Sequence, residues 1–118
     1  MQKEIHNRLK KFAINIVRLV QDFPRVPGIF RIIDQLVGAG TSPAANAREV
    51  QMARSKPEFI SCMGIALREL SEAELWLEIV LELGWADTTT LKNYIKECQE
   101  LKLILSTIIL NTKQGQKV

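Results

Sequence analysis

Apolar residues recur every three or four positions along most of the chain, which is the spacing of one face of an α-helix. The first stripe starts at Ile5 and predicts a helix that ends near Asp22, because Pro24 and then Pro27-Gly28 follow. The apolar members of this stripe are Ile5, Leu9, Phe12, Ile16 and Val20. The N-terminal segment is therefore predicted to be one amphipathic helix.

A second apolar stripe follows the prolines and consists of Ile29, Ile32, Ile33 and Leu36. Gly38, Gly40 and Pro43 then interrupt the pattern. Proline lacks the amide N–H that a helix interior needs, and its ring collides with the preceding turn. Two interpretations stay open for this segment: one helix that is kinked near Pro43, or two helices in sequence.

The third helix has a clear start and a clear end. Ser55-Lys56-Pro57-Glu58 has the pattern of a capping box, in which the serine hydroxyl accepts the amide N–H of Glu58 and the glutamate reaches back. Gly84 offers a left-handed stop. The predicted core stripe between them is Phe59, Cys62, Met63, Ala66, Leu70, Ala73, Leu77, Val80 and Leu81. Glu74, Glu78 and Glu82 fall off this stripe and are predicted to face water.

Asp87 or Thr88 is the candidate N-cap of a fourth helix. Its apolar stripe is Leu91, Ile95, Cys98, Leu101, Leu105 and Ile108, and the polar residues 113–118 are predicted to form a flexible tail. A chain of 118 residues is of the size of one domain with one core. We therefore expect an all-α fold, an up-down four-helix bundle over residues 1–112.

The fourth helix carries more apolar surface than one bundle core needs, because further apolar residues flank its stripe: Leu103, Ile104, Ile109 and Leu110. Self-association would cover such a surface. The third helix adds a strip in which carboxylates alternate with large apolar side chains: Ile65, Glu69, Glu72, Trp76 and Ile79. Both sets are candidate subunit contacts. The alternative for Glu69 and Glu72, partial burial and hydrogen bonding within one bundle, stays open.

Charge is distributed unevenly along the chain, although the formal net charge is only +3. Residues 1–31 contain seven Lys or Arg against two acids, and residues 55–87 contain two against seven. The candidate nucleic-acid-binding residues are Lys3, Arg8, Lys10, Lys11 and Arg18, together with Lys92 and Lys96. Two other interpretations stay open: these are solvated helix faces, or they pair with Glu69 and Glu72 of a neighbouring subunit.

The sequence lacks the residue sets that catalysis or metal binding would need. His6 is the one histidine, so a single chain can form neither a Ser-His-Asp triad nor a multi-histidine metal site, and we expect its side chain to be exposed near the helix end. The glycine-rich residues 38–42 lack the lysine of a phosphate loop. Cys62 and Cys98 show no Cys-x-x-Cys pairing. We predict no enzymatic activity, no metal and no cofactor.

No apolar run approaches the roughly 18 residues that a membrane span requires. The first residues, Met1-Gln2-Lys3-Glu4, are polar and unlike the start of a targeting segment. Two unpaired cysteines suit a reducing compartment. We therefore expect a cytoplasmic protein without membrane contact.

Several segments together resemble a known family. They are residues 40–49 (GTSPAANARE), residues 53–59 (ARSKPEF), residues 65–69 (IALRE), Glu72 and Trp76-Leu77. In this combination the chain resembles the bacterial four-helix-bundle proteins encoded in intervening sequences of 23S ribosomal RNA genes, from the first helix to the fourth. The chain departs from the family pattern at Pro43-Ala44, and at Val37-Gly38, where the family often has a basic residue.

The resemblance implies a left-turning up-down bundle, a homopentamer with a central channel, and no catalytic activity. The family is also similar in fold to the accessory variability protein of diversity-generating retroelements, a basic pentamer that engages a reverse transcriptase and nucleic acid. By that analogy, RNA or DNA and a reverse transcriptase are expected partners. The residues themselves suggest that Asn46 satisfies backbone groups that Pro43 leaves free, with ligand binding by Asn46 as the alternative.

Overall fold

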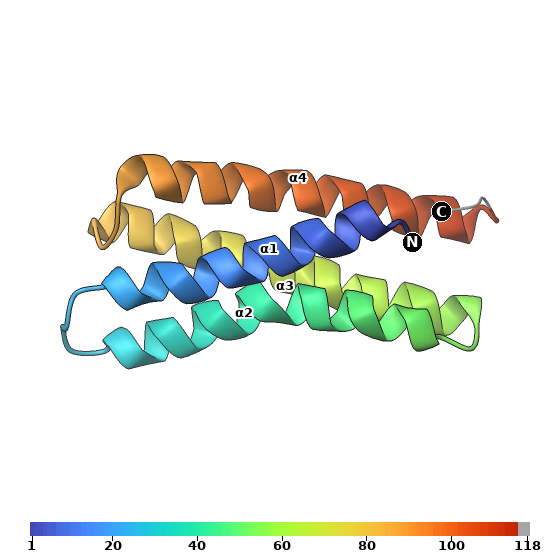
Figure 1. Ribbon diagram of the computed structural model, residues 1–118, viewed down its shortest axis with the longest axis horizontal. Coiled ribbons are helices and arrows are strands. Elements are labelled where there is room, and N and C mark those ends of the chain that lie inside the picture. The colour runs from blue at the N-terminus through green and yellow to red at the C-terminus, as the bar shows by residue number, and fades with distance from the viewer. Residues whose placement is uncertain (116–118) are drawn as a thin grey trace.

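The computed structural model describes residues 1–115, and within this range the chain forms four α-helices and no β-strand. They are α1 (Lys3–Leu19), α2 (Ile29–Glu49), α3 (Lys56–Leu83) and α4 (Thr88–Lys113). Short 3-10 turns extend α1 over Val20–Asp22 and α2 over Val50–Met52. The helices form a rod of 48 × 22 × 19 Å, and the connections between consecutive helices lie at alternate ends (Figure 1). The predicted all-α fold is confirmed. The predicted tail 113–118 lies partly outside the described residues, and Lys113 still belongs to α4.

Local capping residues set the ends of α3 and α4. The Ser55 hydroxyl accepts the amide N–H of Glu58 at 3.2 Å, as predicted, but the Glu58 carboxylate accepts the amide of Arg54, one residue before the cap. Gly84 ends α3 at φ 69°, a conformation that glycine adopts without strain. Of the two candidate caps for α4, the structure selects Asp87, whose carboxylate accepts the Thr90 amide at 2.9 Å.

Helix α2 continues without a break from Ile29 to Glu49, so the interpretation as two helices in sequence is wrong. Ala39, Gly40 and Pro43 lie buried along the side of α2 that packs into the bundle. At Gly40, an added Cβ would come within 2.8 Å of the Ile16 side chain, so glycine allows α1 and α2 to approach closely. An interior proline costs a helix roughly 3 kcal/mol, yet α2 continues through Pro43, whose side chain is fully buried. The kink near Pro43 stays a prediction.

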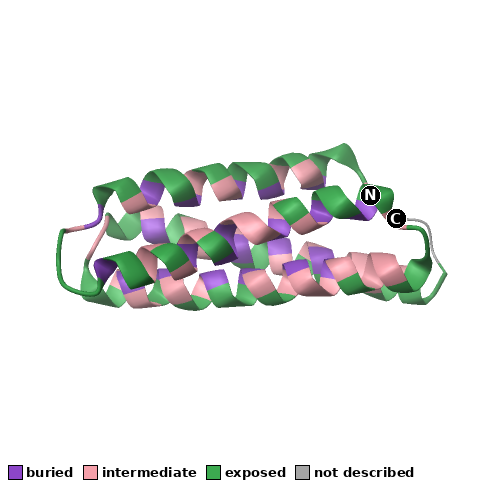
Figure 2. Cartoon of the chain, turned by 90° about the horizontal axis from the view of Figure 1, so that it is seen from below, coloured by how far each residue is buried: buried purple, intermediate pink, exposed green. Residues whose placement is uncertain are grey.

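The predicted apolar stripes form one core between the helices, and exposed residues cover the outside (Figure 2). On α1 the stripe holds from Ile5 to Ile16, whereas Val20 is only half-buried and Leu19 is buried instead. Since α1 ends at Leu19 and a tighter 3-10 turn follows, the helical phase changes at this point. The other large, fully enclosed side chains include Leu36, Met63, Leu70, Leu77, Leu91, Leu101 and Leu105.

The four helices do not pack equally against one another. Helix α3 packs extensively against both α2 and α4, and α1 packs extensively against α2, whereas α1 and α4 share a much smaller contact. Much of the surface of α1 therefore remains open to solvent, including most of its basic residues. At the contact between α1 and α4, ion pairs join the N-terminal helix to the C-terminal helix.

Candidate nucleic-acid interface

Four of the predicted basic residues form an exposed row on α1. Lys3, Lys10, Lys11 and Arg18 are all solvent-exposed, and none of them forms an ion pair within residues 1–115. At 100° per residue they fall within an arc of roughly 100° around the helix axis. These four side chains, named here the α1 basic face, present unpaired positive charge along the length of one helix.

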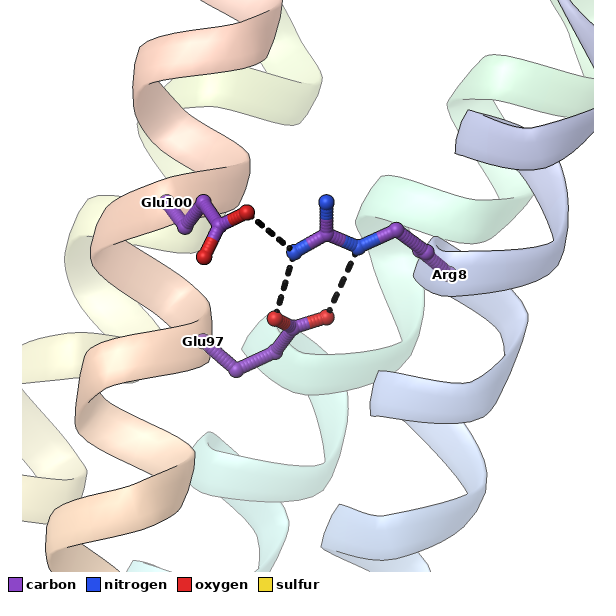
Figure 3. Close-up of polar contacts among 3 residues, drawn as sticks. All are labelled: Arg8, Glu97 and Glu100. Atoms are coloured by element: carbon purple, nitrogen blue, oxygen red, sulfur yellow. Dashed lines mark hydrogen bonds and ion pairs between the residues drawn. The ribbon is translucent and has the colours of Figure 1, made fainter.

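Arg8 differs from the other basic residues of α1 because its guanidinium is bound within the molecule. Nη2 and Nε donate to the two carboxylate oxygens of Glu97 at 2.6 and 3.2 Å, and Nη2 also lies 3.0 Å from Glu100 (Figure 3). The hydrogen bond to Glu97, and then that to Glu100, raises the pKa of Arg8 above its ordinary value. Arg8 thus ties α1 to α4, and its charge is already matched by two carboxylates.

The basic residues of α4 lie apart from the α1 basic face. Lys92 and Lys96 are exposed, one helical turn from each other, and neither is ion-paired within the described chain. Glu97 and Glu100 occupy the part of α4 that meets Arg8. Two carboxylates therefore stand at the α1–α4 contact, where a continuous basic surface would need neutral or basic residues.

Glu74 is not directed to water, contrary to the sequence prediction. Its carboxylate accepts hydrogen bonds from Gln99 and Lys102 of α4, both at 2.9 Å. Although burial opposes ionisation of this carboxyl, these two hydrogen bonds outweigh it and hold the pKa of Glu74 below its usual value. The apolar stripe of α3 predicts which face of the helix points into the core. It does not predict that α4 packs against the adjoining face, where Glu74 lies.

The four apolar residues that flank the α4 stripe divide into two pairs. Ile104 and Ile109 are half-buried and pack against the core, whereas Leu103 is 70% exposed and Leu110 is 54% exposed. A shallow depression of about 300 Å³ lies beside Leu103 and is lined by Glu100, Leu103, Ile104, Thr107 and Ile108. A single chain therefore leaves part of this surplus apolar surface uncovered.

The mixed strip of α3 lies at the edge of the core. Ile65, Glu69, Trp76 and Ile79 are half-buried and Glu72 is exposed. The indole N–H of Trp76 donates to Glu72 of the same helix at 3.5 Å, and neither glutamate forms an ion pair within residues 1–115. Of the alternative interpretation, partial burial with hydrogen bonding inside one bundle, Glu69 shows the partial burial and Glu72 shows the hydrogen bond but is exposed.

The prediction that His6 is exposed is wrong. The residue is half-buried, and its Nε2 atom is enclosed without a hydrogen-bond partner among residues 1–115. Burial lowers the pKa of this imidazole, and the nearby positive charges of the N-terminal amino group and Arg48 lower it further. Because α1 is helical from Lys3 onward, His6 belongs to the ordered helix, where it lies near Arg48 of α2.

Asn46 uses its amide within its own helix. The side-chain Nδ2 donates to the carbonyl oxygen and to the hydroxyl of Ser42, both at 3.0 Å. Ser42 precedes Pro43, but its carbonyl is not the one that loses a donor to the proline, since that carbonyl belongs to Ala39, four residues before Pro43. The prediction that Asn46 satisfies backbone groups freed by Pro43 is therefore wrong, although the amide does have a local structural use within α2.

Neither cysteine is part of a disulfide. Cys62 and Cys98 are both free, and the buried Cys98 thiol donates to the Leu70 carbonyl at 3.1 Å. Among residues 1–115, no three side chains of the metal-binding types His, Cys, Asp and Glu cluster together. None of the helices over this range combines the length and apolar character needed to cross a bilayer.

These features define a class: a small all-α protein of four helices with a basic helix on its surface and uncovered apolar residues on α4. The sequence model of the family described as "23S rRNA-intervening sequence protein" matches residues 1–107. The chain therefore belongs to the 23S rRNA-intervening sequence protein family, and the resemblance noted from the sequence motifs is confirmed.

A solved structure agrees with this assignment. The chain is similar to a crystal structure from Bacteroides thetaiotaomicron described as a protein with unknown function from the S23 ribosomal protein family. The two share 30% sequence identity and a TM-score of 0.82, over 89% of this chain and 97% of that one. Among curated proteins, none matches this chain. Neither the family description nor that of the solved structure indicates an enzyme.

Proposed function

We propose that this protein is a non-enzymatic, cytoplasmic, oligomeric scaffold that binds RNA or DNA through the α1 basic face. The observation that carries the proposal is the exposure of four unpaired cations on one helix. Binding would rest on neutralising phosphates, so its affinity would fall with salt and depend little on sequence. Lys92 and Lys96 extend the interface if the strand also contacts α4, whereas Arg8 holds α1 against α4.

The oligomeric part of the proposal rests on the apolar surface of α4 and the strip on α3. Leu103 and Leu110 are exposed, and Glu69 and Glu72 have no cationic partner within the described chain. In an assembly of up-down bundles, these surfaces would meet neighbouring copies, with a homopentamer as the favoured state. Ring closure would also place several copies of the α1 basic face side by side, which strengthens binding to a long polyanion.

The nucleic-acid proposal is tested by an electrophoretic shift with single-stranded RNA and duplex DNA at low salt. The variant Lys11→Glu with Arg18→Glu reverses two charges of the α1 basic face. If each made one phosphate contact, the slope of log K against log salt would become shallower by about 1.4 on a single strand. The control Arg68→Glu with Lys113→Glu reverses two exposed charges elsewhere. The absence of any complex with the unaltered protein would rule the proposal out.

The assembly is tested separately by measuring mass in solution. A pentamer has five times the mass of the 13.4 kDa chain. Leu103→Lys with Leu110→Lys places charges on the uncovered apolar residues of α4 and is expected to dissociate the assembly into stable monomers. A monomeric unaltered protein would contradict the oligomeric part and leave the binding test intact.

One observation favours a second function. The exposed Leu103, beside an apolar depression, also fits a polypeptide partner, so a protein-interaction adaptor without nucleic-acid binding is the alternative. A reverse transcriptase would be one such partner by the retroelement analogy. In the adaptor case, the α1 basic face pairs with Glu69 and Glu72 of neighbouring copies. Lys11→Glu with Arg18→Glu would then reduce the mass in solution, and the unaltered protein would form no complex with RNA or DNA.

A further inference from the structure

The connection between α1 and α2 lies at one end of the rod (Figure 1), and the first turn of α2 that follows it carries an exposed aromatic residue. Phe30, in the first turn of α2, is 69% exposed, although phenylalanine usually buries its ring. The Arg25 guanidinium lies 5.9 Å from the centre of this ring. This distance is within the range of a cation–π contact. Neither residue is among the nucleic-acid-binding residues predicted from the sequence.

Ring packing and backbone hydrogen bonds order the segment that carries Arg25 and leads into Phe30. Phe23, at the start of the connection, is buried and packs on Trp85 of the α3–α4 connection, with ring centres 5.9 Å apart. The Val26 amide N–H donates a hydrogen bond to the Pro24 carbonyl oxygen at 3.1 Å, and the Ile29 amide N–H donates to the Val26 carbonyl oxygen at 3.2 Å. An aromatic side chain on an ordered segment loses little conformational freedom when a ligand stacks on it.

Arginines and aspartates are equally numerous in the sequence around Phe30, and the Arg25 guanidinium lies over its ring. Arg25 and Arg31 are exposed on either side of Phe30 in the sequence, and neither forms an ion pair within residues 1–115. The nearest carboxylates in the sequence, Asp22 and Asp34, are exposed and likewise unpaired within that range. A nucleobase can stack on the open part of the ring while its phosphate meets an arginine.

We propose that Phe30 and Arg25 form a stacking site for an unpaired base of single-stranded nucleic acid at the α1–α2 end of the bundle. This inference rests on the proposed nucleic-acid function and makes it more specific. The α1 basic face neutralises phosphates but has no aromatic residue among its members, and Phe30 supplies that missing contact. Single strands are therefore preferred over duplexes, whose bases are already stacked.

The test measures fluorescence anisotropy with a labelled oligoadenylate about twelve nucleotides long, and with an abasic strand of equal length. Phe30→Leu keeps an apolar side chain but removes the aromatic face, and is expected to weaken oligoadenylate binding roughly 5- to 100-fold. Binding of the abasic strand should not change. Phe30→Trp keeps a ring and should bind at least as tightly as the unaltered protein.

Met52→Ala is the matched control, because Met52 is 79% exposed at the opposite end of α2. It should leave both affinities unchanged. If Phe30→Leu binds oligoadenylate within about twofold of the unaltered protein, stacking is refuted while the proposed function stands. If the unaltered protein binds neither strand, both proposals fail. A lower mass in solution for Phe30→Leu would instead make Phe30 a contact between copies and overturn the stacking site.

Discussion

Replacing Gly40 by alanine tests the close packing of α1 on α2. The new Cβ would lie 2.8 Å from both γ carbons of Ile16 and 3.0 Å from its β carbon. These atoms are next to the Ile16 backbone and the side chain is fully buried, so rotation about a side-chain bond cannot relieve the contact. Helix α2 must therefore move away from α1. Overpacking of this kind costs about 1–3 kcal/mol.

A second glycine of the same helix provides the matched control. Gly38 is exposed, and a Cβ added there meets nothing within 4 Å. Alanine gains about 1 kcal/mol of helix propensity at either position. Gly38→Ala should therefore stabilise the fold, and Gly40→Ala should be less stable than Gly38→Ala by roughly 1–3 kcal/mol.

Thermal unfolding, followed by circular dichroism at one protein concentration, measures this difference. At about 4 °C per kcal/mol for a chain of this size, the two midpoints should differ by roughly 4–12 °C. In an Ile16→Ala background both γ carbons are absent, so Gly40→Ala should cost less there than in the unaltered protein. If Gly40→Ala proves as stable as Gly38→Ala, the inferred close approach of α1 and α2 is incorrect.

Three further predictions concern the polar contacts. Arg8→Met leaves two carboxylates unpaired at the contact between α1 and α4, and it should lower the free energy of unfolding, measured by urea titration, by roughly 1–2 kcal/mol. The control Arg54→Met removes an exposed ion pair and should change this free energy by less than about 0.5 kcal/mol. The pKa of Glu74 is lowered in the fold, so its carboxylate adds to the free energy of unfolding. This stabilisation is fully present above the pKa of the unfolded state and is lost as pH falls through the lowered pKa of the folded state. Urea midpoints between neutral pH and about pH 3 should thus fall less steeply for Glu74→Gln, and identical slopes would contradict the assignment. Burial raises the pKa of Cys98 to about 12, so this thiol should resist alkylation at neutral pH in the folded protein, while the half-buried Cys62 reacts first; mass spectrometry of the labelled peptides decides between them.

Features that depend on near neighbours in the chain could be predicted from the sequence. The apolar stripes, the Ser55 cap and the Gly84 stop are set by residues within one or two turns, and the structure confirms them except at Val20. The family motifs were also readable, because they consist of short segments at fixed spacing. In the candidate site, the exposure of Lys10, Lys11 and Arg18 follows from their place opposite the apolar stripe of α1.

Other features depend on which helix face meets which neighbour. Arg8 and Glu97 are 89 positions apart, so no local pattern indicates that this arginine is paired while the α1 basic face is unpaired. Glu74 was assigned to water for the same reason, since helical periodicity does not give the direction from which α4 approaches. At Phe30 the apolar residue type suggests burial, but the residue is 69% exposed in the first turn of α2.

The sequence by itself determined that this chain forms helices, where α3 and α4 begin, and to which family it belongs. The tertiary structure decided that α2 runs on through Pro43, that Gly40 must be small, and which charges remain free. The physical reason is that caps and stripes draw their free energy from contacts within a few residues. Close packing and ion pairing instead draw theirs from residues that only the completed fold brings together.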